Sequence, residues 1–324
     1  MTEAVRIHAH GGPEELVFEA VTVPEPMSGQ VRLRQTAIGL NFIDVYHRTG
    51  LYPVPALPAI LGMEAAGVVE AVGPDVSGLA PGDRVAYAGI LGAYTRHRVI
   101  AADRLVHLSP SISDEVAAAM MLKGMTAQYL LRRTYRVQAG DPILVHAAAG
   151  GVGLLLCQWA RHLGATVIGT VGTEAKADLA RANGCHHPIV YTRESFVDRV
   201  RDLTGGEGVA VVYDSVGKDT FDESLDCLRP LGMMVTFGNA SGPVPPVEPA
   251  RLSAKGSLFL TRPTLMTYIA KPSDLQATAR ELLDVVTTGH VRILVGATYR
   301  LAETPQAHRD LENRLTTGST VLLP

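Results

Sequence analysis

The sequence predicts an α/β protein made of a doubly wound parallel sheet and a second, β-rich part, and three observations support this prediction. Residues 142–172 run from a short apolar stretch through an Ala- and Gly-rich turn and a helical pattern to a second apolar stretch. Beyond them, apolar runs and helical patterns alternate as far as residue 261, which is typical of a parallel sheet covered on both faces. Residues 1–120 instead contain short β-like runs with frequent turn signals.

The first 120 residues are predicted to form a partly open β-barrel. We expect strands at residues 5–8 and 31–38, the second of which alternates apolar and basic residues. Residues 62–69, and a turn that leads into a strand at residues 81–85, continue the pattern. Gly and Pro clusters separate these runs, as they do in small antiparallel barrels.

The turn at the centre of the chain predicts a dinucleotide site. Ala148, Gly150 and Gly153 follow the spacing G-x-G-x-x-G, with Ala in the first place and an extra Gly151. Small residues make the turn sharp, let the backbone approach a pyrophosphate and let the helix pack against the strand. The amides and the dipole at the start of the helix then attract phosphate.

The end of the second strand favours NADPH over NADH. Gly172 and Thr173 follow this strand, where an NAD site usually has a carboxylate for the ribose hydroxyl. Glu174 comes slightly late, and Lys176 supplies a charge opposite to that of a 2′-phosphate. The alternative is that Lys176 is simply a solvated residue in the next helix.

From about residue 113 the helical period replaces the β-like one. We expect helices at residues 115–121, 125–133, 176–183, 196–203, 221–228 and 273–287, the first two broken at Lys123 and Gly124, and strands at residues 189–191, 209–213, 233–237, 257–261 and near Val291 and Val321. After Pro263 the chain is expected to return to its first part. Residues 1–122 and 263–324 would then form one domain and residues 123–262 the other, with a ligand cleft between them.

Composition excludes several classes of protein. The 324 residues carry a net charge of -3 and no basic stripe, so we expect no nucleic-acid partner. Apolar runs are too short to span a bilayer, and the first residues lack the apolar core of a secretion signal. Three cysteines lie far apart, which is typical of buried thiols in a reducing compartment, so we expect a cytoplasmic protein.

Several segments resemble a known superfamily. Residues 62–67, 81–85, 146–153, 214–217 and 237–239 resemble those of the medium-chain dehydrogenases/reductases, and residues 41–44, 51–53 and 261–263 resemble their zinc-independent NADPH:quinone oxidoreductases, the group that includes the zeta-crystallins. The likeness spans essentially the whole chain. It implies a Rossmann doubly wound domain plus a GroES-like, partly open β-barrel catalytic domain, with NADPH as cofactor and a quinone as small-molecule substrate.

Two positions argue against a catalytic zinc. Alcohol dehydrogenases of the superfamily carry Cys where this chain has Asn41 and His where it has Met63, and neither replacement suits a site built from Cys and His. Residues 88–94 contain no Cys, so the four-cysteine lobe is also missing. His186 and His187 are read as surface or loop residues. We therefore expect no bound metal.

The resemblance also implies site residues. Asn41, Tyr46 and Tyr52 would line the catalytic site, where hydride, or electrons one at a time, pass to the quinone. Asn41 and Tyr46 are expected to hydrogen-bond the nicotinamide ribose or the quinone oxygen, and Tyr52 to stack on a flat ring or to serve as a packing lid. Cofactor-binding residues would be Asn41, Phe42 and Tyr46; Lys123, Thr126 and Tyr129 at the domain junction; Gly150, Gly151 and Val152 at the pyrophosphate; Gly172, Thr173, Lys176 and Tyr191 around the 2′-phosphate and adenosine; Ser215, Phe237, Gly238 and Asn239 at later strand ends; Thr261 and Arg262 near the return to the first domain; and Thr320 near the C-terminus.

Two alternatives stay open. The first is a zinc-free, NADPH-dependent reductase of enones or enoyl thioesters, although residues 41–58 offer a CoA phosphate no basic residue except Arg48. The second is a cofactor-bound, crystallin-like structural or RNA-binding protein. Relatives dimerise through edge strands of the nucleotide domain, and the apolar, uncharged residues 257–261 are a candidate for such an edge.

Overall fold

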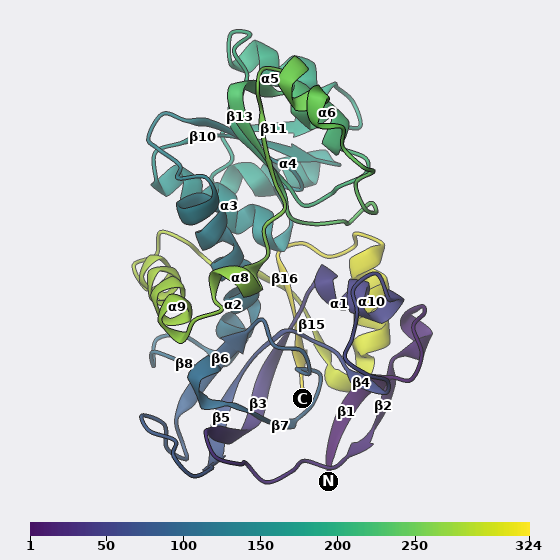
Figure 1. The fold of residues 1–324 in the computed structure, drawn as a ribbon, viewed down its shortest axis with the longest axis vertical. Helices are drawn as coiled ribbons and strands as arrows, with labels where there is room; N and C mark the ends of the chain where they lie inside the picture. The colour runs from purple at the N-terminus through teal and green to yellow at the C-terminus, as the bar shows by residue number, and fades with distance from the viewer. The chain divides into compact units, whose positions relative to one another are not determined.

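The computed structural model describes all of residues 1–324 and contains two compact units (Figure 1). The first unit comprises Met1–Met125, Ile269–Leu283 and Ile293–Pro324, and the second comprises Thr126–Tyr268 and Asp284–Arg292. The predicted boundaries after residues 122 and 262 lie near these limits, whereas residues 284–292 join the second unit. Which unit has which functional role stays a prediction.

The first unit is built on two sheets. Its strands are β1 (Thr2–Ile7), β2 (Val17–Val21), β3 (Gln30–Leu40), β4 (Ala59–Ile60), β5 (Glu64–Val72), β6 (Arg84–Ala88), β7 (His97–Ala101), β8 (Val106–His107), β15 (Val295–Arg300) and β16 (Ser319–Leu323). One sheet has the order β2-β1-β4, and the other has the order β15-β16-β3-β5-β6-β8 with β7 paired to β3. Helices α1 (Phe42–Thr49) and α10 (Thr304–Glu312) belong to this unit.

Strand β3 links the core of the first unit to helix α1. Val31 and Leu33 are buried while Arg34 is exposed, so the predicted alternation of apolar and basic residues is confirmed. The same core contains the fully buried Tyr87 and Tyr94. Because β3 ends at Leu40 and α1 begins two residues later, the well-packed strand fixes where the first turn of this helix lies.

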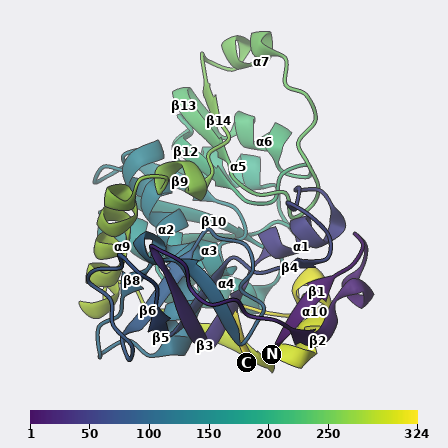
Figure 2. The same cartoon turned by 60° about the horizontal axis from the view of Figure 1, so that its bottom comes forward.

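The second unit is a parallel sheet flanked by helices. Its strands are β9 (Pro142–Val145), β10 (Thr166–Val171), β11 (His187–Val190), β12 (Val209–Asp214), β13 (Leu228–Thr236) and β14 (Phe259–Thr261), and its helices are α3 (Gly151–His162), α4 (Glu174–Ala182), α5 (Phe196–Leu203), α6 (Phe221–Asp226), α7 (Pro249–Ala254) and α8 (Leu265–Tyr268). The strand order is β11-β10-β9-β12-β13-β14, with β14 at one edge (Figure 2). Every pair in this sheet is parallel, which confirms the predicted doubly wound Rossmann arrangement.

A row of apolar side chains crosses the centre of this sheet. Leu144 of β9 is paired with Ile168 of β10 and Val212 of β12, and all three belong to one buried cluster. Phe196 of α5 and Phe221 of α6 belong to the same cluster. The buried row therefore attaches these helices to one face of the sheet and holds the strand ends in a fixed register.

One predicted helix break is wrong. Residues 114–129 form a single helix, α2 (Asp114–Tyr129), which continues as a π-helical turn over Leu130–Thr134. Gly124 lies inside this helix because its missing side chain makes room for Leu282. A Cβ atom at this position would lie 2.4 Å from the Leu282 Cδ1 atom. Glycine here serves close packing and does not end the helix.

The C-terminal part also differs from the prediction. The predicted helix is confirmed as α9 (Pro272–Thr287), but no strand forms at Val291, and β15 begins at Val295. Helix α10 was not predicted. None of the helices combines the length and the apolar character that crossing a membrane requires.

Candidate functional site

The Ala- and Gly-rich turn is tied to both strands beside β9. The backbone amide of His146 donates to the Tyr213 carbonyl of β12 at 3.0 Å, and that of Ala148 donates to the Thr170 carbonyl of β10 at 3.0 Å. Between them, Ala147 has a φ of 52°, a left-handed conformation that non-glycine residues seldom adopt. Such strain is typical of functional turns that their surroundings hold in place.

Helix α3 begins directly after this turn with its first amides uncapped by a side chain. Gly150 is the N-cap residue, no side chain accepts from the first turn, and the first turn contains no acidic residue. A Cβ atom on Gly153 would lie 2.2 Å from the Ala147 carbonyl oxygen, so only glycine allows the helix to approach the turn this closely. The positive end of α3 is therefore available to an anion.

The structure brings together the residues predicted around a 2′-phosphate. Thr173 caps α4, where its hydroxyl accepts a hydrogen bond from the Lys176 amide at 3.3 Å. A Cβ atom on Gly172 would lie 3.1 Å from the Tyr191 hydroxyl oxygen. Thr192 donates to the Gly172 carbonyl at 3.1 Å. All of these residues follow the carboxyl ends of β10 and β11, the edge at which ligands of such sheets bind.

Arg193 was not predicted to contribute to this subsite. Its Nη1 atom lies 2.6 Å from the Glu174 Oε1 atom, so the nearby carboxylate is paired with a guanidinium. This pairing offsets a charge that would repel a 2′-phosphate. The signal in the sequence was a basic residue three positions beyond the end of strand β11, but its partner could not be inferred without the pairing of β10 and β11.

The residues predicted at the later strand ends also lie together. The Phe237 amide donates to the Asp214 carbonyl at 2.8 Å, and Arg262 donates from Nη1 to the Gly238 carbonyl at 3.0 Å. A Cβ atom on Gly238 would lie 2.3 Å from the Ser215 carbonyl oxygen. Asn239 follows directly, and Thr261 ends β14. These ends form a close-packed edge in which glycine is required.

Tyr129 occupies a different environment. Its ring stacks on that of Tyr268, with centroids 4.4 Å apart and an interplanar angle of 13°, and it is 2% exposed. Thr126 lies one turn earlier in the same helix. The structure therefore gives Tyr129 a packing role, while a role in cofactor binding stays a prediction for both residues.

In the first unit, the three predicted catalytic residues lie close together. Asn41 is the N-cap residue of α1, and Phe42 and Tyr46 lie on that helix. The Tyr52 amide donates to the Tyr46 carbonyl at 3.0 Å, and the two rings meet edge to face with centroids 5.1 Å apart. Thr320 is paired across strands with Leu40, the residue before Asn41.

A buried ion pair lies behind Asn41. The fully buried Glu64 accepts from the Asn41 Nδ2 atom at 2.8 Å and from the Lys123 Nζ atom at 2.9 Å, and Lys123 also donates to the Leu40 carbonyl at 3.2 Å. The carboxylate fixes the amide orientation, because its oxygens can only accept. One hydrogen of the Asn41 Nδ2 group is used by Glu64, so Asn41 can present its second Nδ2 hydrogen, a donor, and its amide oxygen, which also takes part in the capping box with the Asp44 backbone amide, to a ligand.

A second buried network, absent from the sequence prediction, joins α1 to α10. Asp44 accepts from the Tyr94 hydroxyl at 2.8 Å, and Tyr94 in turn lies 3.1 Å from the His308 Nε2 atom. Arg48 binds the His308 ring and, through two contacts of 2.8 and 2.9 Å, Glu312. Burial raises the pKa of Asp44 to about 7, and burial followed by the Arg48 charge lowers the pKa of His308 to about 3.

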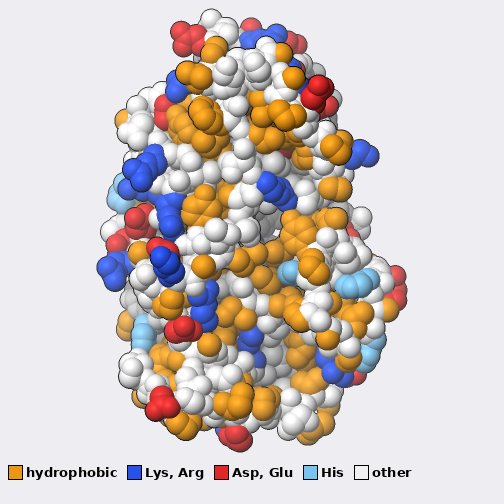
Figure 3. All heavy atoms as spheres, viewed as in Figure 1, with side chains coloured by type: hydrophobic (Ala, Val, Ile, Leu, Met, Phe, Trp, Pro, Cys, Tyr) orange, Lys and Arg blue, Asp and Glu red, His pale blue; other side chains and the backbone are white.

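The charged side chains were compared with what a metal ion or a nucleic acid would require. No group of three or more His, Cys, Asp or Glu side chains is placed so that it could hold a metal ion. On the face drawn in Figure 3, Lys and Arg side chains lie among Asp and Glu side chains.

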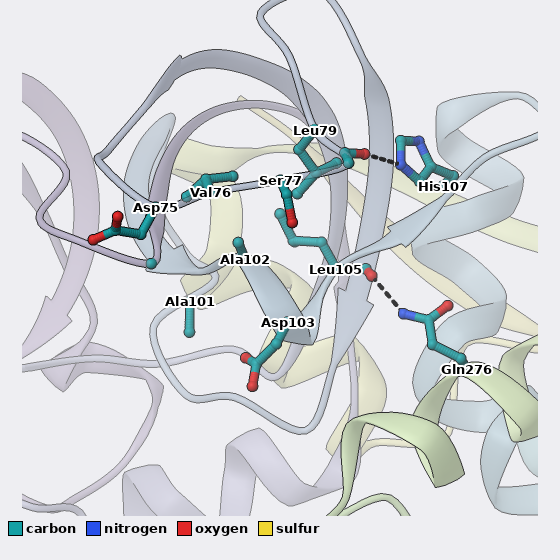
Figure 4. Close-up of a pocket in the computed structure, with 12 residues that line it drawn as sticks. Asp75, Val76, Ser77, Leu79, Ala101, Ala102, Asp103, Leu105, His107 and Gln276 are labelled. Carbon is teal, nitrogen blue, oxygen red and sulfur yellow. Dashed lines mark hydrogen bonds between the residues drawn. The ribbon is translucent and has the colours of Figure 1, made fainter.

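A separate hollow lies in the first unit, away from the predicted residues. It has a volume of about 540 Å³ and is lined by Asp75, Asp103, His107 and Gln276, among others (Figure 4). His107 and Gln276 are hydrogen-bonded to the Gly78 and Leu105 carbonyls. With two carboxylates and no Lys or Arg in its lining, this hollow does not suit a phosphorylated cofactor.

Two protein-family models match the chain. The model described as "Zinc-binding dehydrogenase" matches residues 151–312, and the model described as "Alcohol dehydrogenase GroES-like domain" matches residues 27–131. The first description names zinc, whereas the donor set at Asn41 and Met63 does not suit a Cys and His site.

Similar proteins cover the full chain. The quinone oxidoreductase of Pseudomonas aeruginosa is 54% identical, with 100% of both chains covered. The 2-haloacrylate reductase of a Burkholderia species is 49% identical, with 100% of this chain and 99% of that protein covered. The Escherichia coli quinone oxidoreductase, solved in complex with NADPH, is 47% identical with a TM-score of 0.97 over 99% of this chain and 100% of that chain. The chain therefore belongs to the quinone oxidoreductase family of the medium-chain dehydrogenase/reductase superfamily.

Proposed function

We propose that this protein reduces quinones with NADPH as the electron donor and without a bound metal. The observation that carries the proposal is the Ala- and Gly-rich turn at residues 147–153, which leads into a helix start that no side chain caps, in a chain whose full-length relatives include quinone oxidoreductases, one of them solved with NADPH. NADPH, when bound, supplies the hydride, or electrons one at a time. The protein's residues bind and orient the two reactants and exclude water.

The turn and α3 would hold the pyrophosphate. Gly151 and Val152 present their backbone amides at the start of a helix that no side chain caps, and no acidic residue of the first turn competes for that place, whereas the Gly150 amide donates to the Ala147 carbonyl at 2.9 Å and gives the anion room to approach. Gly153 allows the close packing of helix and turn. This donor set suits an anion and fits a pyrophosphate.

Preference for NADPH over NADH would come from charge at the ends of β10 and β11. Lys176 supplies a cation, and the Arg193 guanidinium offsets the charge of the Glu174 carboxylate. Tyr191 lies over Gly172 and offers a flat face to the adenosine. These groups together favour a 2′-phosphate over a bare hydroxyl.

The reacting groups would meet at the start of α1. Since only one Nδ2 hydrogen of Asn41 is bonded to Glu64, the second can donate to a quinone oxygen, while the amide oxygen can accept from a hydroxyl such as that of the nicotinamide ribose. Tyr46 and Tyr52 each have a hydroxyl that can donate to the quinone oxygen and a ring that can stack on it. The quinone is electron-poor, so orientation against the nicotinamide provides most of the catalysis.

The surroundings of Asn41 support zinc independence. The Glu64 carboxylate, which is hydrogen-bonded to the Asn41 side chain, is already paired with the Lys123 ammonium at 2.9 Å. A divalent cation at this place would be repelled by Lys123 and would find an amide and a thioether in place of thiolate and imidazole.

The rival function is reduction of an activated alkene. A relative that is 49% identical is a 2-haloacrylate reductase, and enones share with quinones an electron-poor carbon next to a carbonyl group. Acyl-CoA substrates are less favoured, because Arg48, the basic residue that residues 41–58 offer to their phosphates, is 1% exposed and paired with Glu312.

Assembly and location are also proposed. We infer a homodimer formed along β14, an edge strand on which Phe259 is 56% exposed. A cytoplasmic location is proposed because the three cysteines are buried free thiols.

The experiment compares substrates under one set of conditions. NADPH consumption by the purified protein is measured with benzoquinone, naphthoquinone, 2-chloroacrylate and crotonyl-CoA. We expect kcat/KM to be highest for a quinone. A higher value for either alkene would replace the proposed function with the rival one, and RNA binding in a filter assay at moderate salt would favour the crystallin-like alternative.

A further inference from the structure

Four buried side chains form a hydrogen-bond chain that runs in one direction. Arg48 lies with Nη1 3.1 Å from His308 Nδ1, His308 Nε2 lies 3.1 Å from the Tyr94 hydroxyl oxygen, and Tyr94 lies 2.8 Å from Asp44 Oδ2. Each of the four residues is at most 1% exposed. They come from α1, α10 and the segment before β7, which are far apart in the sequence.

The chemistry of the end groups fixes every proton in this chain. A guanidinium has no acceptor, so His308 must accept at Nδ1 and carry its hydrogen at Nε2. His308 then donates to Tyr94, and Tyr94 donates its own hydrogen to Asp44. The lowered pKa of His308 agrees with this neutral tautomer. The hydrogen-bond chain therefore ends with the Tyr94 hydroxyl donating to Asp44.

Asp44 differs from the other carboxylates of this region because it has no paired cation. Glu64 of β5 is paired with Lys123 of α2, and Glu312 of α10 is paired with Arg48. No cation is paired with Asp44, and its Oδ1 atom has no hydrogen-bond partner. Its raised pKa has desolvation as the largest cause, opposed by hydrogen bonds from Tyr94 and Asn41, with the Glu64 charge adding to the rise and Lys123 opposing it.

The same carboxylate holds the start of α1. Asp44 Oδ2 accepts from the backbone amide of Asn41 at 2.9 Å, and Asp44 is the third residue of the helix that follows. A carboxylate at a helix start binds such an amide and the helix dipole more strongly than a neutral acid does. Protonation of Asp44 would weaken the contact that positions Asn41 at the start of the helix that carries Tyr46. His47, on the same helix, faces Tyr52 and is not part of the chain.

We propose that Asp44 is a positioning residue whose ionised form holds Asn41 and helix α1 in place for catalysis, and that Tyr94 and His308 keep Asp44 ionised in the neutral pH range. This inference rests on the proposed quinone reductase function. It predicts that activity falls as the pH is lowered through the neutral range, and that the group whose protonation causes this fall is Asp44, which contacts neither cofactor nor substrate.

The test compares Tyr94→Phe with Tyr87→Phe. Tyr87 is an equally buried tyrosine of the same core, and it is hydrogen-bonded to Gln35 and Arg98 instead of to Asp44. Removing the Tyr94 hydroxyl takes one hydrogen bond from the carboxylate, which should raise its pKa by about one unit. The acid limb of kcat/KM should then move up by about one pH unit, so that activity falls about fivefold at pH 7 and hardly at all at pH 9. Tyr87→Phe should keep the wild-type profile.

Two variants of His308 keep the test independent of Tyr94. His308→Gln offers an acceptor to Arg48 and a donor to Tyr94, so it should keep the wild-type profile. His308→Leu offers neither and should shift the limb as Tyr94→Phe does. A merely structural role would lower the activity of both tyrosine variants equally at every pH.

Amide hydrogen exchange of residues 42–49 separates this inference from the proposed function. We expect these amides, after correction for intrinsic rates, to exchange faster in Tyr94→Phe than in the wild type at pH 8, and at the wild-type rate in Tyr87→Phe. An unchanged pH profile and unchanged exchange in Tyr94→Phe overturn the inference. If the wild type reduces no quinone but the exchange responds as expected, the proposed function fails and Asp44 still controls α1.

Discussion

We propose that single side chains at the ends of β10 and β11 decide whether the protein prefers NADPH or NADH. Lys176 supplies the cation, and the contact between Arg193 and Glu174 removes an opposing charge. A charge pairing of this kind acts on the 2′-phosphate and leaves the rest of the dinucleotide untouched. Discrimination between NADPH and NADH is therefore a property of one or two residues.

Lys176→Ala should weaken NADPH binding about tenfold, because one charge-assisted contact with the phosphate is lost, and should leave NADH binding nearly unchanged. Fluorescence titration of both nucleotides measures this. Lys255→Ala is the matched control, since Lys255 of the same unit is paired with Asp226 and lies in no predicted site. Equal loss for both nucleotides would remove Lys176 from the 2′-phosphate subsite.

The raised pKa of Asp44 leads to a prediction about how stability depends on pH. Burial raises its pKa from 3.8 to about 7, so the folded state binds the Asp44 proton more tightly than the unfolded state does. The stability that this proton provides is fully present below pH 3.8 and is lost as the pH rises through 7. Asp44→Asn removes this titration. Between pH 4 and pH 8 the variant should gain about 2–4 kcal/mol relative to the wild type, measured by urea unfolding. A difference that stays constant with pH would show that Asp44 does not titrate in this range.

At the scale of elements, a substitution in the turn between β9 and α3 can abolish cofactor binding without lowering stability. Gly151→Asp places a carboxylate in the first turn of α3, where it interacts favourably with the helix dipole but repels a pyrophosphate. The thermal midpoint should be unchanged or slightly higher, while NADPH binding is abolished. Retained affinity would exclude the turn from phosphate binding.

Gly153→Ala is expected to behave differently. Its Cβ atom would lie 2.2 Å from the Ala147 carbonyl oxygen, so helix and turn must move apart. We expect a loss of about 1–3 kcal/mol in unfolding free energy together with weaker NADPH binding. Calorimetry with and without NADPH measures both effects. A variant as stable as the wild type would contradict the close packing of helix and turn.

The elements that the sequence predicted well are those with local signals. The strand, turn and helix around Gly150 follow from spacing within about 30 residues, and the helix at residues 196–203 was predicted to the residue. The continuous α2 was missed because Gly124 packs against Leu282, more than 150 residues later. Local propensity cannot reveal a tertiary contact of this kind.

The site was predictable to the same extent. Asn41 and Lys176 were found by resemblance and by local charge, whereas the Arg48 to His308 contact spans 260 positions in the sequence. No pattern marks His308 as a partner of α1, because its helix was itself not predicted. The pairing of β10 with β11, which brings Arg193 to Glu174, likewise becomes visible only in the folded sheet.

At the scale of the whole molecule, the exposed edge of β14 leads to a prediction about assembly. Phe259→Lys places a charge on the exposed edge strand and should convert a dimer into a monomer, measured by sedimentation. Leu315→Lys is the control, because this residue of the first unit is also an exposed apolar side chain and lies outside β14. A wild-type protein that sediments as a monomer would contradict the proposed dimer.

The central claim is that the chain uses NADPH to reduce a quinone and that its own residues, without a metal, provide the site. NADPH consumption with naphthoquinone, measured on protein dialysed against a strong chelator and analysed for metals, tests it most directly. We expect full turnover from a protein that holds no stoichiometric metal. Loss of turnover on chelation with recovery on adding zinc, or no turnover with any quinone before chelation, would contradict the account.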